Sequence, residues 1–168
     1  MRYTKISMTD VIIAGAGAAG LMTAITAARR GLSVTVLEPN RKTGKKLRIT
    51  GKGRCNVTND SAPQEFLQKV CTNARFLKSS LYAFPPEAVK DFFEEAGVPL
   101  KTERGERVFP VSDNANDIAD TLERMAKSAG VRFVRERLAD IRTEGGHVSA
   151  VVTDRDEYPC RAVVLCTG

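Results

Sequence analysis

The sequence predicts an α/β fold in which helices flank a mostly parallel sheet. Two apolar runs, residues 10–14 and 33–37, have the length and composition of strands that are buried on both faces. The segment between them, residues 18–30, has apolar residues at helical spacing. Further along, residues 138–160 alternate in the manner of a small antiparallel meander. With 168 residues, 42% hydrophobic and 27% charged, the chain is long enough for one ordinary domain with its own core.

The first three elements are a strand, a helix and a second strand. The run DVIIA ends at Ala14, and SVTVL occupies residues 33–37. The helix between them is followed by Gly31, which suits a helix C-cap because glycine adopts left-handed backbone without strain. Parallel strands joined through a helix connect in the right-handed sense, so these residues predict a right-handed crossover unit.

The remaining elements alternate less regularly. We expect helices at residues 63–71, 73–84, 86–96 and 114–129, and extended segments at residues 99–102 and 107–111. We expect buried strands at 131–134 and 162–166, and a meander made of residues 138–143, 147–153 and 157–160. This order predicts one domain whose core, residues 8–60 and 114–168, carries a mostly helical insertion at about residues 61–112.

Positive charge is concentrated in one loop, residues 41–54, which we call the basic segment. It contains no acidic residue and the seven cations Arg41, Lys42, Lys45, Lys46, Arg48, Lys52 and Arg54. The chain has 26 Lys and Arg, so 19 remain outside this segment, against 20 Asp and Glu. Such a run is either a solvated surface or a site for the phosphates of a nucleotide or a nucleic acid.

The cysteine and histidine content argues against metal or triad chemistry. The cysteines, at positions 55, 71, 160 and 166, include no C-x-x-C pair, and His147 is the single histidine. We therefore expect no metal site, and free cysteines favour a reducing, cytoplasmic compartment. Residues 11–28 carry no charge, but glycine and alanine supply too little transfer energy for us to expect a membrane span there.

A glycine motif follows the first strand and opens the first helix. Gly15, Gly17 and Gly20 form G-x-G-x-x-G, with Ala18 and Ala19 between the last two glycines. In this context the motif predicts a dinucleotide site, in which backbone approaches a pyrophosphate at the helix N-terminus. A carboxylate at the end of the second strand, Glu38, can accept hydrogen bonds from ribose hydroxyls and disfavours the 2'-phosphate of NADP in this site. The motif alone leaves NAD and FAD open.

Four segments resemble, in their order, those of one protein family: GAGAAGLMTAITAARRGLSVTVLE, GKKLRITGKGRCNVTN, RVFPVSDNANDIADTL and AVVLCTG. The chain resembles bacterial FAD-containing flavoproteins labelled NAD(P)/FAD-dependent oxidoreductase, aminoacetone oxidase-like or BaiN-like. The first motif is common to many flavoproteins, whereas the G-R-C-N-x-T-N block is far more particular. Family members are more than twice as long. The resemblance thus implies a Rossmann-like, FAD-binding N-terminal portion, apparently truncated before the substrate or cap domain.

The resemblance also implies which residues contact the cofactor. It places the pyrophosphate at the glycine motif, the adenosine ribose at Glu38 and the adenine at the backbone of Leu138. It implies further contacts along the cofactor at Lys45, Lys46, Gly51, Gly53, Arg54, Cys55, Asn56, Thr167 and Gly168. No second cysteine follows Cys55 at redox-disulfide spacing, so we expect a structural or flavin-neighbouring thiol there; facing the cations, it would favour the thiolate.

These observations predict the FAD-binding portion of a flavin-dependent oxidoreductase that acts on a small organic substrate by hydride transfer through the flavin. NAD(P)H is a possible electron donor, and catalytic residues are not identified. We expect no specific nucleic-acid partner and no membrane partner, and the 168 residues by themselves are not expected to turn over substrate. Two alternatives stay open: a NAD-binding Rossmann module without flavin, and an RNA-associated flavoprotein that uses the basic segment.

Overall fold

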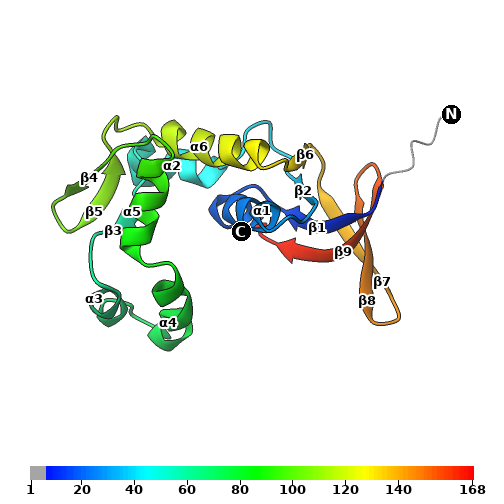
Figure 1. Ribbon diagram of the computed structural model, residues 1–168, viewed down its shortest axis with the longest axis horizontal. Helices are drawn as coiled ribbons and strands as arrows, with labels where there is room; N and C mark the ends of the chain where they lie inside the picture. Colours follow the sequence, from blue (N-terminus) through cyan, green and yellow to red (C-terminus); the bar gives the residue numbers. More distant parts are fainter. Residues whose placement is uncertain (1–6) are drawn as a thin grey trace. The chain divides into compact units, whose positions relative to one another are not determined.

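The computed structural model describes residues 7–168, which form two compact units (Figure 1). The first unit comprises the chain up to Lys45 together with Leu122–Gly168, and the second comprises Lys46–Thr121. Their boundary falls inside helix α6, Ala115–Ser128. The sequence predicts a core of residues 8–60 and 114–168; in the division into compact units, most of the basic segment lies in the second unit.

The first unit contains a six-stranded sheet with the order β6-β2-β1-β9-β8-β7. Its strands are β1 Thr9–Ala14, β2 Val34–Leu37, β6 Arg132–Val134, β7 Leu138–Glu144, β8 His147–Thr153 and β9 Glu157–Leu165. The strands β6, β2, β1 and β9 run parallel, whereas β7, β8 and the start of β9 pair antiparallel. The α/β class, the Rossmann-like parallel sheet and the small meander are thereby confirmed.

The crossover from β1 to β2 passes through helix α1, Ala18–Arg29. All four residues of β2 are buried, as expected for a strand with neighbours on both sides and helix packing above. On α1, Leu21, Ala24 and Ile25 are buried, which is the apolar face that the helical spacing predicts. Gly31 ends the helix with a φ of 83° and donates its N–H to the carbonyl of Ala28.

The strand β9 is longer than the sequence indicates. We expected two strands, 157–160 and 162–166, because Arg161 interrupts the apolar run; the structure has one continuous strand instead. Arg161 is exposed, and a terminal nitrogen of its guanidinium lies 3.4 Å from a carboxylate oxygen of Asp10. Its charge is therefore not buried, and the strand can continue through this residue. Before Cys160 the strand pairs with β8, and from Cys160 onward it pairs with β1, which joins meander and parallel sheet.

The second unit contains short helices and a three-stranded antiparallel sheet with the order β3-β5-β4. Its elements are α2 Lys45–Gly53, β3 Thr58–Asn59, α3 Pro63–Gln68, α4 Ala74–Ala83, α5 Pro86–Glu95, β4 Leu100–Glu103 and β5 Arg107–Pro110. Proline occupies the first turn of α3 and of α5, where its missing N–H is not needed. The sequence did not predict α2 or β3.

Candidate nucleotide-binding site

The loop between β1 and α1 is shaped by two glycines that pack backbone against backbone. Gly15 has a φ of +103°, and a Cβ on it would lie 2.4 Å from the carbonyl oxygen of Cys166. A Cβ on Gly20 would lie 1.9 Å from the carbonyl oxygen of Gly15. Both distances are far below van der Waals contact, so the protein's own packing requires glycine at these two positions.

The middle glycine of the motif faces open space. A Cβ on Gly17 would meet nothing within 4 Å, and its φ of −79° is accessible to any residue. Gly17 is the N-cap of α1, no side chain caps this helix, and no acidic residue lies in its first turn. Ala18 and Ala19 are exposed. The first N–H groups of a twelve-residue helix therefore border unfilled space, which is the arrangement that binds anionic phosphates.

The carboxylate of Glu38 ties the end of β2 to this loop. Its Oε2 accepts a hydrogen bond from the N–H of Ala16 at 2.9 Å. Its Oε1 accepts from the backbone N–H of Asn40 at 2.9 Å and from Nδ2 of Asn40 at 2.7 Å. Carboxylate oxygens have further lone pairs, so Glu38 can still accept from a hydroxyl group. We did not single out Asn40 from the sequence, although an asparagine two residues after an acid at a strand end is a turn signal.

The end of β9 lies beside the first glycine. The N–H of Cys166 donates to the carbonyl of Ala14 at 2.8 Å, and Cα of Thr167 would be 3.2 Å from a Cβ on Gly15. Thr167 and Gly168 are exposed. The first unit therefore brings together the glycine motif, Glu38 and the Thr167–Gly168 segment, although these lie at opposite ends of the sequence.

Leu138 starts β7, where it pairs with Thr153 and packs against the cluster of Ile12, Leu37, Val151, Tyr158 and Cys160. The backbone next to Glu38 is instead that of Val134, whose carbonyl accepts the Glu38 N–H at 3.0 Å. Sequence reasoning did not single out Val134 because an apolar strand residue carries no chemical signal.

The remaining predicted residues of the G-K-G-R-C-N block, 51–56, lie in the second unit. Helix α2 is interrupted there: Thr50 is extended, and Gly51 and Lys52 both have a φ of 58°. A Cβ on Gly51 would lie 3.0 Å from the backbone nitrogen of Asn56 and 3.1 Å from the ring of Phe109. With its side-chain amide turned to donate, Asn56 reaches the carbonyl of Val108 at 3.2 Å. These contacts fold the block onto β5.

The guanidinium of Arg54 is held by carboxylates of its own unit. Its two terminal nitrogens donate to Glu103 at 3.1 and 2.7 Å, and Asp113 lies 3.4 Å away. The guanidinium carbon sits 3.9 Å from the centre of the Phe109 ring. The hydrogen bonds from Arg54 lower the pKa of the Glu103 carboxyl. Arg54 therefore neutralises acids of the protein, and a phosphate would have to compete with them.

The thiol of Cys55 is in an apolar environment. Its side chain is 1% exposed, and burial raises its pKa to about 11. A thiolate was expected only if the thiol faced the cations of the basic segment. The thiol is buried instead, so that condition is not met, and burial penalises its charged form. Among the described residues, no group of three or more His, Cys, Asp and Glu could hold a metal ion.

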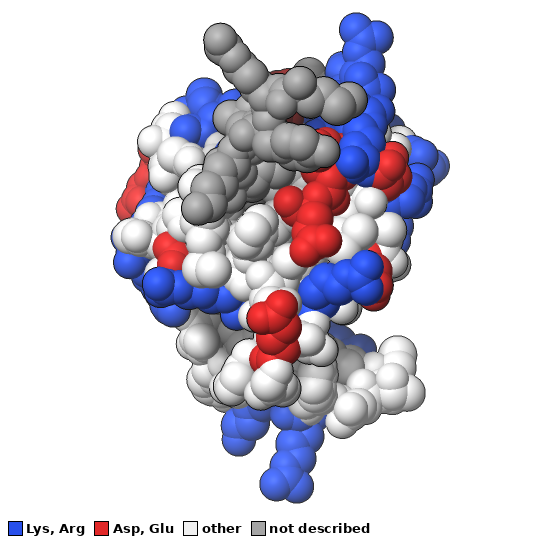
Figure 2. Space-filling view, turned by 90° about the vertical axis from the view of Figure 1, so that its right-hand side faces the viewer, with Lys and Arg blue, Asp and Glu red and all other residues white. Residues whose placement is uncertain are grey.

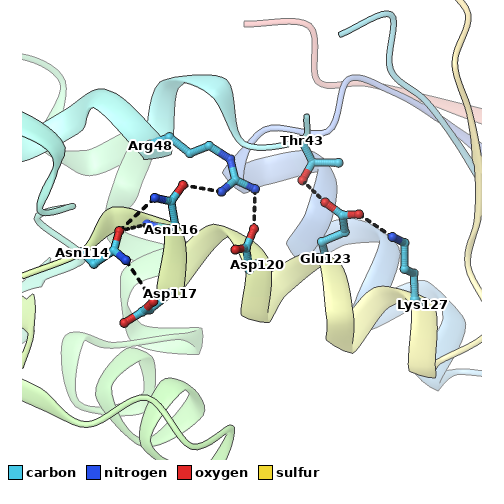
Figure 3. A network of polar contacts seen from close by, with 8 residues as sticks. All are labelled: Thr43, Arg48, Asn114, Asn116, Asp117, Asp120, Glu123 and Lys127. Atoms are coloured by element: carbon cyan, nitrogen blue, oxygen red, sulfur yellow. Dashed lines mark hydrogen bonds and ion pairs between the residues drawn. The ribbon is translucent and has the colours of Figure 1, made fainter. Parts of the chain in front are cut away.

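The other cations of the basic segment fall into two classes. Arg48 donates to Asn116 and Asp120 of α6, both at 2.7 Å, and Figure 3 shows its guanidinium directed at these two side chains. The remaining cations form no ion pair with any residue in 7–168: Arg41, Lys42, Lys45, Lys46 and Lys52. All of these are exposed, so they are available to an external anion.

A separate part of the network in Figure 3 holds the loop after β2 within the first unit. The hydroxyl of Thr43 donates to Oε2 of Glu123 at 2.6 Å, and Lys127 pairs with the other oxygen of that carboxylate. The N–H of Gly44 donates to the carbonyl of Ala16 at 2.7 Å. Lys45 directly follows Gly44, so this hydrogen bond holds the backbone before Lys45 against Ala16 of the glycine motif.

Comparison with known proteins places this arrangement in context. Residues 9–168 match the HI0933-like protein Rossmann domain. The chain is 30% identical over 167 residues to a 3-dehydro-bile acid delta(4,6)-reductase of Clostridium scindens, covering 96% of this chain and 39% of that protein. It is 27% identical to a ribosomal RNA dihydrouridine synthase of Haemophilus influenzae, covering 95% of this chain and 40% of that protein. The chain thus spans about 40% of the length of these relatives.

Among solved structures, the chain superposes on a 3-ketosteroid-delta4-(5alpha)-dehydrogenase from Rhodococcus jostii with a TM-score of 0.73 and 20% identity. The match covers 97% of this chain and 46% of that one. At this identity the likeness establishes the fold. In residues 7–168, no helix has the length and apolarity needed to cross a membrane.

Proposed function

The chain belongs to the family of HI0933-like Rossmann domains, and from this premise we propose that it holds FAD for an oxidoreductase that transfers a hydride through the flavin. The observation that carries the proposal is the contrast within one motif. Gly15 and Gly20 are closed in by the protein's own backbone, whereas Gly17 faces space at the start of a helix. Gly17 is the one glycine of the motif at which the protein leaves space open, and this space is suited to a pyrophosphate.

Each residue of the first unit would have a defined task with FAD bound. The N–H groups at Gly17, Ala18 and Ala19 would hold the pyrophosphate, and Glu38 would accept from the adenosine ribose. The backbone of Val134, next to Glu38, is better placed for the adenine than that of Leu138. Bound FAD would supply hydride transfer through its ring system, which is chemistry of the cofactor.

The exposed lysines that follow the loop after β2 would offset the two negative charges of the FAD pyrophosphate. Lys45 and Lys46 are exposed and have no ion-pair partner within residues 7–168, so they are available for this task. We keep the contacts of Gly51, Gly53, Cys55, Asn56, Thr167 and Gly168 with the cofactor as part of the proposal. Arg54 we assign to the fold of the second unit, because Glu103 and Asp113 already bind it.

We propose that the substrate is an organic ring with a carbon–carbon double bond that the enzyme reduces. The names of both curated relatives denote reduction of such a ring, in a 3-dehydro-bile acid and in a uridine. The overall reaction would add a hydride from NAD(P)H and a proton from solvent to the two carbons of the double bond. A small organic molecule is the first candidate; a uracil ring in RNA is the second, and the relative that modifies ribosomal RNA favours it.

The test is to purify the intact protein and to identify its cofactor. We expect a yellow preparation that releases FAD on denaturation, and whose flavin is bleached by NADH or NADPH under anaerobic conditions. Re-oxidation by a conjugated cyclic enone or by a uridine-containing RNA would then identify the substrate class. A colourless protein that rejects FAD in titration and binds NADH would overturn the proposal in favour of a flavin-free Rossmann module.

A further inference from the structure

The outer face of helix α4, Ala74–Ala83, carries unpartnered side chains of two kinds. Arg75, Lys78, Ser79 and Tyr82 stand at the spacing i, i+3, i+4 and i+7, which places them on one face of the helix. They line an open hollow of about 370 Å³. No residue of α4 is buried, and Tyr82 is 46% exposed. We call these four residues the α4 face.

The charge of the α4 face is entirely positive. Arg75 and Lys78 are the only charged residues of the helix, and neither forms an ion pair with any residue in 7–168. On the face shown in Figure 2, by contrast, acidic and basic side chains lie among one another. Because helix α4 contains no acidic residue, neither cation is offset by an acid on its own helix.

Aromatic side chains stand next to these cations. Besides Tyr82 within the hollow, Phe76 on the same helix is 77% exposed and Phe84 at its end is 41% exposed. Helix α4 and its C-terminal end thus combine exposed aromatic rings with two cations that form no ion pair within residues 7–168. The same combination is the one with which proteins bind single-stranded nucleic acid: cations follow the phosphates, and bases stack on aromatic rings.

We propose that the α4 face binds single-stranded RNA, with Arg75 and Lys78 at the phosphates and a base stacked on Tyr82. The proposal rests on the proposed function in its second form, in which a uracil ring of RNA is reduced. The sequence predicts no specific nucleic-acid partner and leaves open, as an alternative, that the basic segment contacts RNA. The α4 face is the better candidate, because α4 combines positive charge with aromatic rings, whereas residues 41–54 contain no aromatic residue. An anionic membrane surface is the competing occupant that the experiment separates from RNA.

The experiment measures the affinity of the intact, flavin-loaded protein for a fluorescent single-stranded RNA of about ten nucleotides. Binding is followed at several salt concentrations for Arg75→Ala/Lys78→Ala, Tyr82→Ala and Tyr82→Phe. The matched control is Arg41→Ala/Lys42→Ala, which removes the same charge from exposed, unpaired positions of the basic segment. Flavin content and thermal stability are measured on the same samples, so failure of the cofactor assignment is seen separately from failure of RNA binding.

We expect the Arg75→Ala/Lys78→Ala variant to bind more weakly and to reduce the slope of log K against log salt by about 1.4, as for two phosphate contacts on a single strand. Tyr82→Ala should weaken binding roughly tenfold or more, whereas Tyr82→Phe should bind like the parent because it retains the stacking ring. The control should stay within about twofold at physiological salt, because exposed charges that do not contact the RNA are largely screened there.

Three results would overturn the inference. The first is equal loss of affinity in the control and in the α4 variants, which would assign RNA to the basic segment or to net charge. The second is tighter binding of the parent to anionic phospholipid vesicles than to RNA, with the same dependence on Arg75 and Lys78. The third is loss of flavin or a large drop in thermal stability in Tyr82→Ala and Tyr82→Phe alike, which would make α4 an internal packing surface.

Discussion

The two glycine-rich segments of the chain, residues 15–20 and 51–53, look alike in the sequence and differ in structure. In the first, Gly15 and Gly20 contact backbone, and Gly17 borders open space at a helix N-terminus. In the second, Gly51 packs against Asn56 and Phe109, and the neighbouring Arg54 is bound by Glu103. The first segment leaves space open at a helix N-terminus, whereas the contacts of the second lie within its own unit.

This difference shows that a glycine or a cation in a motif has to be judged by what fills the space around it. The family resemblance implies that residues 51–56 lie along the cofactor, as the first segment does. Arg54 and Arg48, however, are engaged by acidic and amide groups of their own unit. Lys45 and Lys46, which form no ion pair with any residue in 7–168, remain the better candidates for a phosphate.

The largest effect is expected for Gly20→Val. The new Cβ would lie 1.9 Å from the carbonyl oxygen of Gly15, which is backbone and has no way to yield without separating α1 from β1. We expect destabilisation of more than about 3 kcal/mol, at or beyond the upper range for overpacking. Chemical denaturation monitored by circular dichroism checks this. A variant as stable as the parent would show that helix and strand do not pack through this glycine.

Gly17→Val should separate folding from cofactor binding. Nothing lies within 4 Å of the new Cβ, and the backbone conformation is open to valine, so we expect stability without FAD within about 1 kcal/mol of the parent. FAD binding should be abolished, because the side chain would occupy the space of the pyrophosphate. Flavin titration and denaturation of the same apoprotein give both values. Unchanged FAD affinity would place the phosphate site elsewhere.

The sequence was informative wherever the determining contacts are local. The buried strands β1 and β2, helix α1 and the glycine motif were predictable, because apolar spacing and turn residues dictate them within a few positions. Helix α2 was not, since Arg48 is fixed by Asn116 and Asp120, far away in the chain. The acids that bind Arg54 are similarly remote, and no pattern around residue 54 announces them.

Arg54→Ala should affect the second unit more than the cofactor. Loss of the bidentate bond to Glu103 and of the contact with Phe109 should lower thermal stability, by less than Gly20→Val does, with flavin content retained. Since Arg54 lowers the pKa of Glu103 below the ordinary 4.5, its contribution is present above pH 4.5 and is lost as pH falls through the lowered pKa. Thermal melts of parent and variant should therefore converge in acid.

Glu103→Gln and the double variant complete a mutant cycle for this pair. A coupling energy between residues 54 and 103 that vanishes in acid would confirm that the pair is stabilised by charge rather than by packing. Loss of FAD in Arg54→Ala with no change in thermal stability would reverse the assignment and make Arg54 a cofactor ligand like those of the first segment.

The smallest effect concerns the thiols of the second unit. Cys55 is 1% exposed with a pKa raised to about 11, whereas Cys71 is exposed. At pH 8 a disulfide reagent should therefore modify Cys71 quickly and leave Cys55 unmodified until denaturant is added, because reaction requires an accessible thiolate. Mass spectrometry of the modified protein identifies the sites, and Cys71→Ser serves as the control that removes the fast phase. Rapid modification of Cys55 in the native Cys71→Ser variant would mean that residues 51–56 open to solvent. The contacts of Gly51 and Asn56 with β5 would then not be sufficient to keep Cys55 buried.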